Sequence, residues 1–186
     1  MSRALRRILR IRRFRRDERG AMSVEALLIL PMLLWAYMAM FIYWDAFRAI
    51  NTHTKATYTV ADMLSREMNP VSSAYIDGLA SIHRFITQVP SGDSYIRVTH
   101  FQYDEENDAF VVLWSRSTAG APPGLNAAGL GGMRDRVPVM ADADTAVLVE
   151  AWRVFRPRLD VGIGDRVFNE FTVVRPRFLS PIPFTS

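Results

Sequence analysis

One long apolar segment near the N-terminus dominates the polarity pattern of this 186-residue chain. Residues 26–44, ALLILPMLLWAYMAMFIYW, contain no formally charged side chain. A helix rising about 1.5 Å per residue would span about 28 Å over this segment, close to the ~30 Å hydrocarbon core of a bilayer. Tyr43 and Trp44 at its distal end are typical of an interfacial aromatic belt. The pattern predicts a transmembrane helix over 21–44, with a kink at Pro31 because proline removes a backbone donor.

Beyond the apolar segment, small and apolar residues recur at alternating spacings of three and four, the period of one helix face. The members of this stripe are Phe47, Ile50, Thr54, Thr57, Ala61, Leu64 and Met68. We therefore expect an amphipathic continuation of the helix over 45–69, ending at Asn69-Pro70. A second helix is predicted over 73–89, with Ser72 or Ser73 as its cap. Its expected apolar face contains Leu79, Ile82, Phe85, Ile86 and Val89.

The remaining pattern is that of β-strands. Alternating or β-branched runs predict four strands, over 95–103, 109–115, 145–155 and 167–175. The acidic turn 104–108 would join the first two as a hairpin, and the Gly-, Ala- and Pro-rich residues 117–133 are expected to form a mobile loop. The expected fold class is α+β, with a long N-terminal helix, a second helix and a four-stranded, mainly antiparallel sheet in an exported domain over 70–186.

Charge is distributed unevenly and sets an orientation. Residues 1–20 carry nine arginines against two acidic residues, a net charge of +7; because the whole chain carries +4, residues 21–186 carry −3. Arginines that directly precede an apolar segment mark its cytoplasmic side, which favours a membrane protein over a nucleic-acid-binding arm. The absence of cysteine excludes disulfides, thiol catalysis and thiolate metal sites.

A carboxylate directly before the uncharged run is the most informative candidate site. An ionisable group in a membrane segment is costly, so it indicates function and calls for a partner. Glu25 stands five residues after Gly20. Cleavage after Gly20 would create that partner, a new α-amino group on Ala21.

A basic leader, a glycine, four residues, a glutamate and an apolar helix together resemble the class III signal of type IV prepilins. The resemblance implies that a membrane-embedded aspartyl prepilin peptidase cuts after Gly20 on the cytoplasmic side. It also implies that Ala21 becomes the mature N-terminus and that Glu25 docks the subunit by pairing with the N-terminal amine of a neighbour. An ammonium and a carboxylate attract strongly in a low dielectric, so such a pair would set register during assembly.

Four stretches, RDERGAMSVEALLILPMLL, KATYTVADMLSR, VPVMADADTAVLVE and VVRPRF, resemble TadE-like pseudopilins of the tight-adherence (Tad) system, which builds Flp pili. Ala26 replaces the tyrosine that follows this glutamate in major Flp pilins, and Ala21 replaces the phenylalanine that begins most filament-forming pilins. No Asp-x-Ser-x-Ser metal motif of TadG-like relatives occurs. The resemblance therefore implies a minor pseudopilin, pilin-like in fold, in the bacterial inner membrane with its C-terminal domain in the periplasm. Its expected partners are the prepilin peptidase, other Tad pilins or pseudopilins, and assembly-platform proteins.

Two alternatives stay open beside this reading. One is an uncleaved, single-pass anchored periplasmic binding or scaffold protein, and the other is an anchored enzyme whose site is assembled from scattered residues. A secretory signal peptide is disfavoured, because the apolar run is long and its distal half offers no small-x-small cleavage site.

The polar residues predict no catalytic, metal or cofactor site. His53, His83 and His100 lack ligand spacing, so they are interpreted as surface or packing residues. The acidic turn 104–108 offers the oxygen ligands that calcium prefers, but it lacks the spacing and terminal glutamate of a known loop, so a solvated turn is favoured. We predict that the chain is not an enzyme but the substrate of one.

Overall fold

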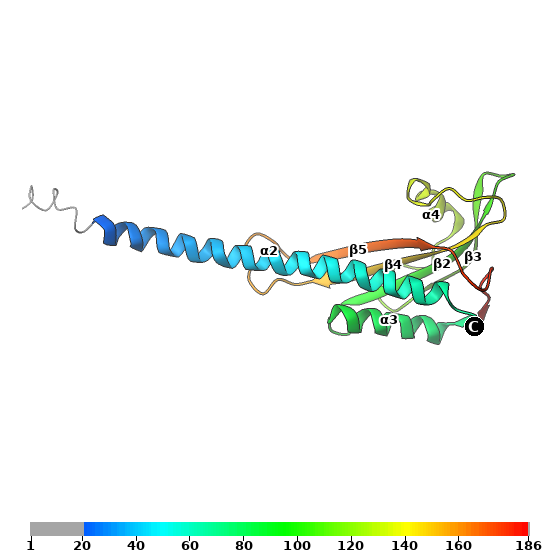
Figure 1. Ribbon diagram of the computed structural model, residues 1–186, viewed down its shortest axis with the longest axis horizontal. Helices are drawn as coiled ribbons and strands as arrows, with labels where there is room; N and C mark the ends of the chain where they lie inside the picture. The colour runs from blue at the N-terminus through cyan, green and yellow to red at the C-terminus, as the bar shows by residue number, and fades with distance from the viewer. Residues whose placement is uncertain (1–20, 186) are drawn as a thin grey trace, which may run out of the picture. The chain divides into compact units, whose positions relative to one another are not determined.

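The computed structural model describes residues 21–185 and confirms the α+β class (Figure 1). In chain order the helices and strands are α2 (Ala21–Ser65), β1 (Val71–Ser72), α3 (Ser73–Thr87), β2 (Ser94–Asp104), β3 (Ala109–Ser117), α4 (Ala127–Gly131), the 3-10 helix η2 (Arg134–Arg136), β4 (Thr145–Phe155), β5 (Arg166–Val174) and β6 (Phe184–Thr185). The chain divides after Trp44 into two compact units. Helix α2 contributes to both of them.

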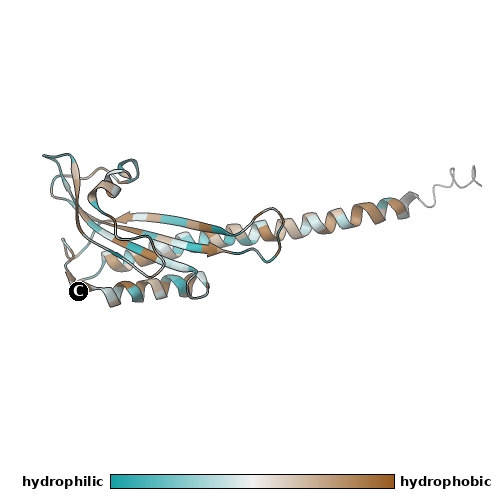
Figure 2. Cartoon of the chain, turned by 180° about the vertical axis from the view of Figure 1, so that it is seen from behind, coloured by the Kyte–Doolittle hydropathy of each residue, from teal (hydrophilic) through white to brown (hydrophobic). Residues whose placement is uncertain are grey.

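Within the described residues, the first unit is the N-terminal part of α2, which runs without interruption through Pro31. Hydrophobic residues dominate this part of the helix (Figure 2). Among the described residues, α2 is the one helix long and apolar enough to cross a membrane. Its large apolar side chains between Val24 and Phe41 are all exposed, several of them by more than 60%.

The second unit is built on a four-stranded sheet in the order β3-β2-β4-β5, antiparallel throughout. The predicted hairpin of β2 and β3 is confirmed, with Asp104 opposite Ala109 next to the turn. A parallel pair of two-residue strands, β1 and β6, joins the start of α3 to the C-terminal tail. The sequence did not predict this pair, because two residues are too few to show alternation.

Both faces of the sheet are covered, since successive side chains of a strand point to opposite sides. One face packs against α2 and α3 around a cluster that includes Val60, Ala61, Leu64, Ile76, Leu79, Ile96, Val98, Val147, Val149 and Ala151. The other face packs against the segment around α4 through Phe101, Phe110, Leu130, Met140, Ala146 and Leu148. The central strands β2 and β4 are therefore buried over most of their length.

The segment 117–133, predicted as a mobile loop, contains helix α4. The Asn126 side chain accepts a hydrogen bond from the Gly129 backbone N–H and caps the helix. Leu130 is completely buried in the second cluster. A five-residue, glycine-rich helix is too short to show helical periodicity, so its composition alone suggested an irregular loop.

The predicted apolar faces of the two helices are wrong in part. Thr57, Ala61 and Leu64 are buried as expected, but Phe47 and Met68 are 64% and 67% exposed. The stripe that α2 buries in the second unit is Ala46, Ala49, His53, Ala56, Thr57, Val60, Ala61, Leu64 and Ser65. Small and polar residues form its first half, so a search for large apolar residues selected the neighbouring stripe.

The buried face of helix α3 also differs from the predicted face. The Ser72 side chain caps it by accepting from the Tyr75 backbone N–H, as predicted. Its buried residues are Ile76, Leu79, His83 and Thr87, whereas Phe85 is 83% exposed. Both helices also end earlier than predicted: α2 ends at Ser65 and not at 69, and α3 ends at Thr87 and not at 89.

Candidate functional site

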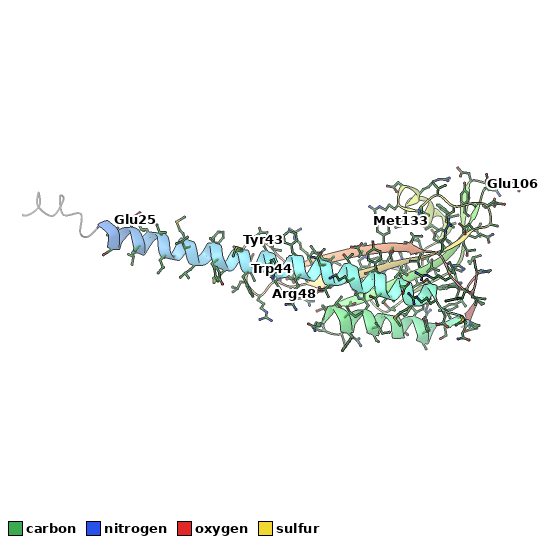
Figure 3. The ribbon with its side chains drawn as sticks, in the orientation of Figure 1. Glu25, Tyr43, Trp44, Arg48, Glu106 and Met133 are labelled. Carbon is green, nitrogen blue, oxygen red and sulfur yellow. The ribbon has the colours of Figure 1, made fainter. Side chains whose placement is uncertain are left out.

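The carboxylate singled out in the sequence lies one turn into helix α2. Glu25 is exposed, and its neighbours Val24, Leu27 and Leu28 are exposed by 58%, 73% and 64% (Figure 3). Within residues 21–185, Glu25 takes part in no ion pair. The arrangement thus presents a single carboxylate on an apolar helical surface.

The other residues of the predicted processing site lie at or before the start of this helix. Ala21 is the first residue of α2. Gly20 lies outside the described residues. Pro31 lies inside the helix, six residues beyond Glu25.

The apolar surface around Glu25 implies a non-aqueous neighbour. Monomeric soluble proteins rarely expose contiguous apolar patches of this kind, and larger patches mark membrane or protein contacts. Each fully buried leucine-sized side chain contributes about 1.5–3 kcal/mol, so a helix with this many exposed apolar residues is strongly driven out of water.

A second candidate site is a pair of buried histidines that sequence reasoning did not bring together. His53 on α2 and His83 on α3 are 1% and 0% exposed. Their Nδ1 and Nε2 atoms are 3.2 Å apart, and the rings meet edge to face. The His83 Nδ1 atom also lies 2.7 Å from the Ser94 hydroxyl. These residues are thirty positions apart on separate helices, so no local spacing could have revealed the pair.

Burial holds both histidines in the neutral form. Burial and, to a smaller extent, the nearby Arg153 guanidinium lower the pKa of His53 to about 4, and burial, the His53 ring and Arg153 together lower that of His83 to about 3. In the neutral pair, one ring N–H donates to the nitrogen of the other ring, whereas an additional proton would create a desolvated positive charge without a counter-ion. The pair therefore packs as a neutral polar contact between α2, α3 and the sheet.

The pair does not form a metal centre with other residues of the described chain. Among residues 21–185, no group of three or more His, Cys, Asp or Glu side chains is placed to hold a metal ion. The Nε2 atom of His53 is buried without a hydrogen-bond partner in this part of the protein. A buried polar atom without a partner costs stability.

The third histidine, His100, makes hydrogen bonds to two separate segments of the second unit. A carbonyl only accepts, so the His100 Nδ1–H must donate to the Ala146 carbonyl, 3.0 Å away. Its Nε2 then accepts from the Ile182 backbone N–H at 3.1 Å. His100 thereby connects the C-terminal tail to β4, and burial lowers its pKa, which favours the neutral ring. The sequence predicts surface or packing roles for the histidines. All three are buried packing residues, and none lies on the surface.

The acidic turn directs its side chains to protein partners. Asp104 accepts from the backbone and side-chain N–H groups of Asn107. Asp108 pairs with Arg134 and accepts from the Tyr103 hydroxyl. Asp142 accepts from the Glu105 backbone N–H. Such contacts are those of a stabilised hairpin turn.

Comparisons with known proteins give no further guide: no family model, no curated protein and no solved structure matches this chain. What the residues define is an α+β domain joined to one helix with the length and apolar composition to cross a membrane. That combination is consistent with single-pass anchoring. A more specific function has to be argued from the N-terminal residues themselves.

Proposed function

We propose that this protein is a minor pseudopilin of the TadE type, cut by a prepilin peptidase after Gly20 and active in the assembly of Flp/Tad pili. One observation carries the proposal. Glu25 is an exposed carboxylate on an apolar helical surface, five residues after Gly20 and four after the Ala21 at which α2 begins. The uncleaved-anchor reading leaves this acid only the role of an interfacial residue that snorkels to the membrane surface.

The chemistry of the cut explains why the acid belongs there. Cleavage leaves each subunit with one ammonium at Ala21 and one carboxylate at Glu25. Either charge alone is heavily penalised in hydrocarbon, whereas the pair is strongly attractive. A subunit that gives its carboxylate to one neighbour and its amine to the next makes a head-to-tail contact, which generates an open-ended assembly. Docking of this kind sets the axial register of the helices.

The leader supports the proposed orientation. With nine arginines before the apolar segment and no further arginine until Arg48, the N-terminus lies in the cytoplasm and the α+β domain in the periplasm. The protein is then a structural component anchored in the inner membrane and not an enzyme. Its partners are the peptidase, other Tad pilins or pseudopilins and the assembly platform.

The proposal is tested by comparing Glu25→Ala with the matched variant Glu106→Ala, which removes an exposed acid from the turn between β2 and β3 (Figure 3). Both variants are expected to be cut normally. Pilus number per cell should fall more than tenfold for E25A and stay at the wild-type level for E106A. Normal piliation by E25A would remove the docking role and favour the uncleaved anchored binding or scaffold protein.

A further inference from the structure

A polar cavity of about 390 Å³ lies at one end of the second unit. It is bounded by α2, by the C-terminal end of α3, by β4 and by the segment that follows β4. Its charged lining consists of Asp45, Arg48, Arg153 and Arg158. Three guanidinium groups against one carboxylate give the cavity lining a net charge of +2.

The three arginines of the cavity differ from most others in the second unit. Ion pairs with carboxylates are formed by Arg66, Arg97, Arg134, Arg156, Arg175 and Arg177. Within residues 21–185, no ion pair involves Arg48, Arg153 or Arg158. The cavity thus collects positive charge that the described protein does not neutralise.

Arg153 has the least complete environment of the three. Its Nη1 donates to the Ala49 carbonyl at 2.5 Å, while its Nε atom is buried without a hydrogen-bond partner in the described chain. Burial lowers the pKa of Arg153, and Asp45 offsets this only in part. A half-buried charge whose fully buried Nε–H donor is unused is costly unless an anion completes it.

The position of the cavity along the chain indicates where its ligand comes from. The uncharged segment ends at Trp44, and Asp45 and Arg48 follow it by one residue and by four. At about 1.5 Å per residue, both lie within roughly 6 Å of the end of that segment along α2. If the segment spans the bilayer, this separation along the chain puts both residues at the depth of the lipid headgroups.

We infer that this cavity binds a phosphate-bearing anion through Arg48, Arg153 and Arg158, the ligand being either the headgroup of an anionic phospholipid or free phosphate. Guanidinium groups present paired N–H donors whose spacing matches phosphate oxygens. A bound phosphate balances the net charge and supplies an acceptor for the unused donor of Arg153. The lipid source rests on the membrane-anchoring part of the proposed function, whereas the anion chemistry does not.

The test uses the full chain, labelled with ¹⁵N-arginine, in a nonionic detergent. The Nε–H signal of Arg153 serves as the reporter during titration with three probes at constant ionic strength: dihexanoyl-phosphatidylglycerol, dihexanoyl-phosphatidylcholine and inorganic phosphate. The test variant R48Q/R158Q keeps Arg153 and removes two exposed charges from the cavity. The matched variant R116Q/R136Q removes two exposed charges that do not line it.

We expect phosphatidylglycerol to shift the Arg153 signal with an apparent Kd that is at least tenfold weaker in R48Q/R158Q and within twofold of wild type in R116Q/R136Q. A phosphatidylglycerol Kd at least tenfold below that of inorganic phosphate assigns the site to a lipid headgroup, and comparable values assign it to free phosphate.

Three results would overturn the inference: no shift of the Arg153 signal with any anion, equal loss in both double variants, or phosphatidylcholine binding as tightly as phosphatidylglycerol. Failure of the pseudopilin proposal is distinguishable from these. A protein that retains residues 1–20 would contradict that proposal and would leave the titration unchanged.

Discussion

The two units of the chain differ in where their apolar side chains lie, although one helix contributes to both. In the first unit, the side chains of Leu27, Leu33 and Phe41 are all more than half exposed. In the second unit, the same helix buries Val60, Ala61 and Leu64 completely against α3 and the sheet. The second unit therefore provides its own apolar environment, and the first requires one from a bilayer or from neighbouring helices.

The carboxylates of the two units differ in the same way. Glu150 on β4 is buried but paired with Arg97, whose Nε and Nη2 atoms are 2.6 and 2.8 Å from its two oxygens. Glu25 has no such partner in the described chain and stands on an apolar surface. The domain thus pairs the buried Glu150 carboxylate internally, whereas Glu25 has no ion-pair partner among the described residues; under the proposed function, a neighbouring subunit provides one.

The largest expected effect comes from breaking the internal pair. Glu150→Ala leaves the Arg97 guanidinium buried without its counter-charge, and we expect the free energy of unfolding to fall by about 3–5 kcal/mol. Glu25→Ala should leave that free energy unchanged within about 0.5 kcal/mol, because the domain does not use this acid. Chemical denaturation followed by tryptophan fluorescence measures both. Equal destabilisation by the two variants would refute the contrast.

The same substitution at two places in α2 tests the contrast for apolar residues. Leu64→Ala creates a cavity in the core and should lower the free energy of unfolding by about 2–5 kcal/mol. Leu33→Ala, at a site that is 60% exposed, should change it by less than about 0.5 kcal/mol. The same denaturation experiment in detergent compares them. A large loss from L33A would show that the first unit is part of the domain core.

Acid should destabilise the second unit through its buried histidines. Both have lowered pKa values, about 4 for His53 and about 3 for His83, so the unfolded chain binds more protons below its ordinary histidine pKa of 6.5. The contribution of the neutral histidines to the free energy of unfolding is fully present above pH 6.5. It falls as the pH drops toward 4, by about 1–3 kcal/mol per pH unit when both rings contribute. Unfolding midpoints between pH 7 and 5 measure the slope. A flat profile would contradict the burial of an uncharged pair.

The smallest expected effect is at Phe47, which the sequence placed on the buried stripe of α2. Because its side chain is 64% exposed, Phe47→Ala should cost the domain less than about 0.5 kcal/mol. Thermal unfolding of this variant beside L64A gives the comparison. A loss above about 2 kcal/mol would restore the stripe predicted from the sequence.

The sequence predicted those features of the fold that depend on local pattern. The four strands, the hairpin turn 104–108 and the Ser72 cap followed from alternation and capping chemistry, and each is confirmed. Residues that pack for reasons outside their own segment were not predictable. Ala49 and His53 are buried because β4 and α3 lie against them, and Arg153 lines a cavity with Arg48 through tertiary contact alone.

The candidate site residues likewise fall into a group that local sequence pattern predicts and a group that it does not. Glu25, Ala21 and Gly20 form a local motif, so they were found from spacing, and their roles stay predictions. The paired histidines and the basic cavity involve residues thirty to more than one hundred positions apart, for which a single sequence carries no signal.

Processing of this chain as a pseudopilin is tested by the intact mass of the protein extracted from membranes of a host with a prepilin peptidase. We expect one mature species beginning at Ala21, and only the full-length chain when the peptidase gene is deleted. A protein that retains residues 1–20 while the peptidase is active would contradict it.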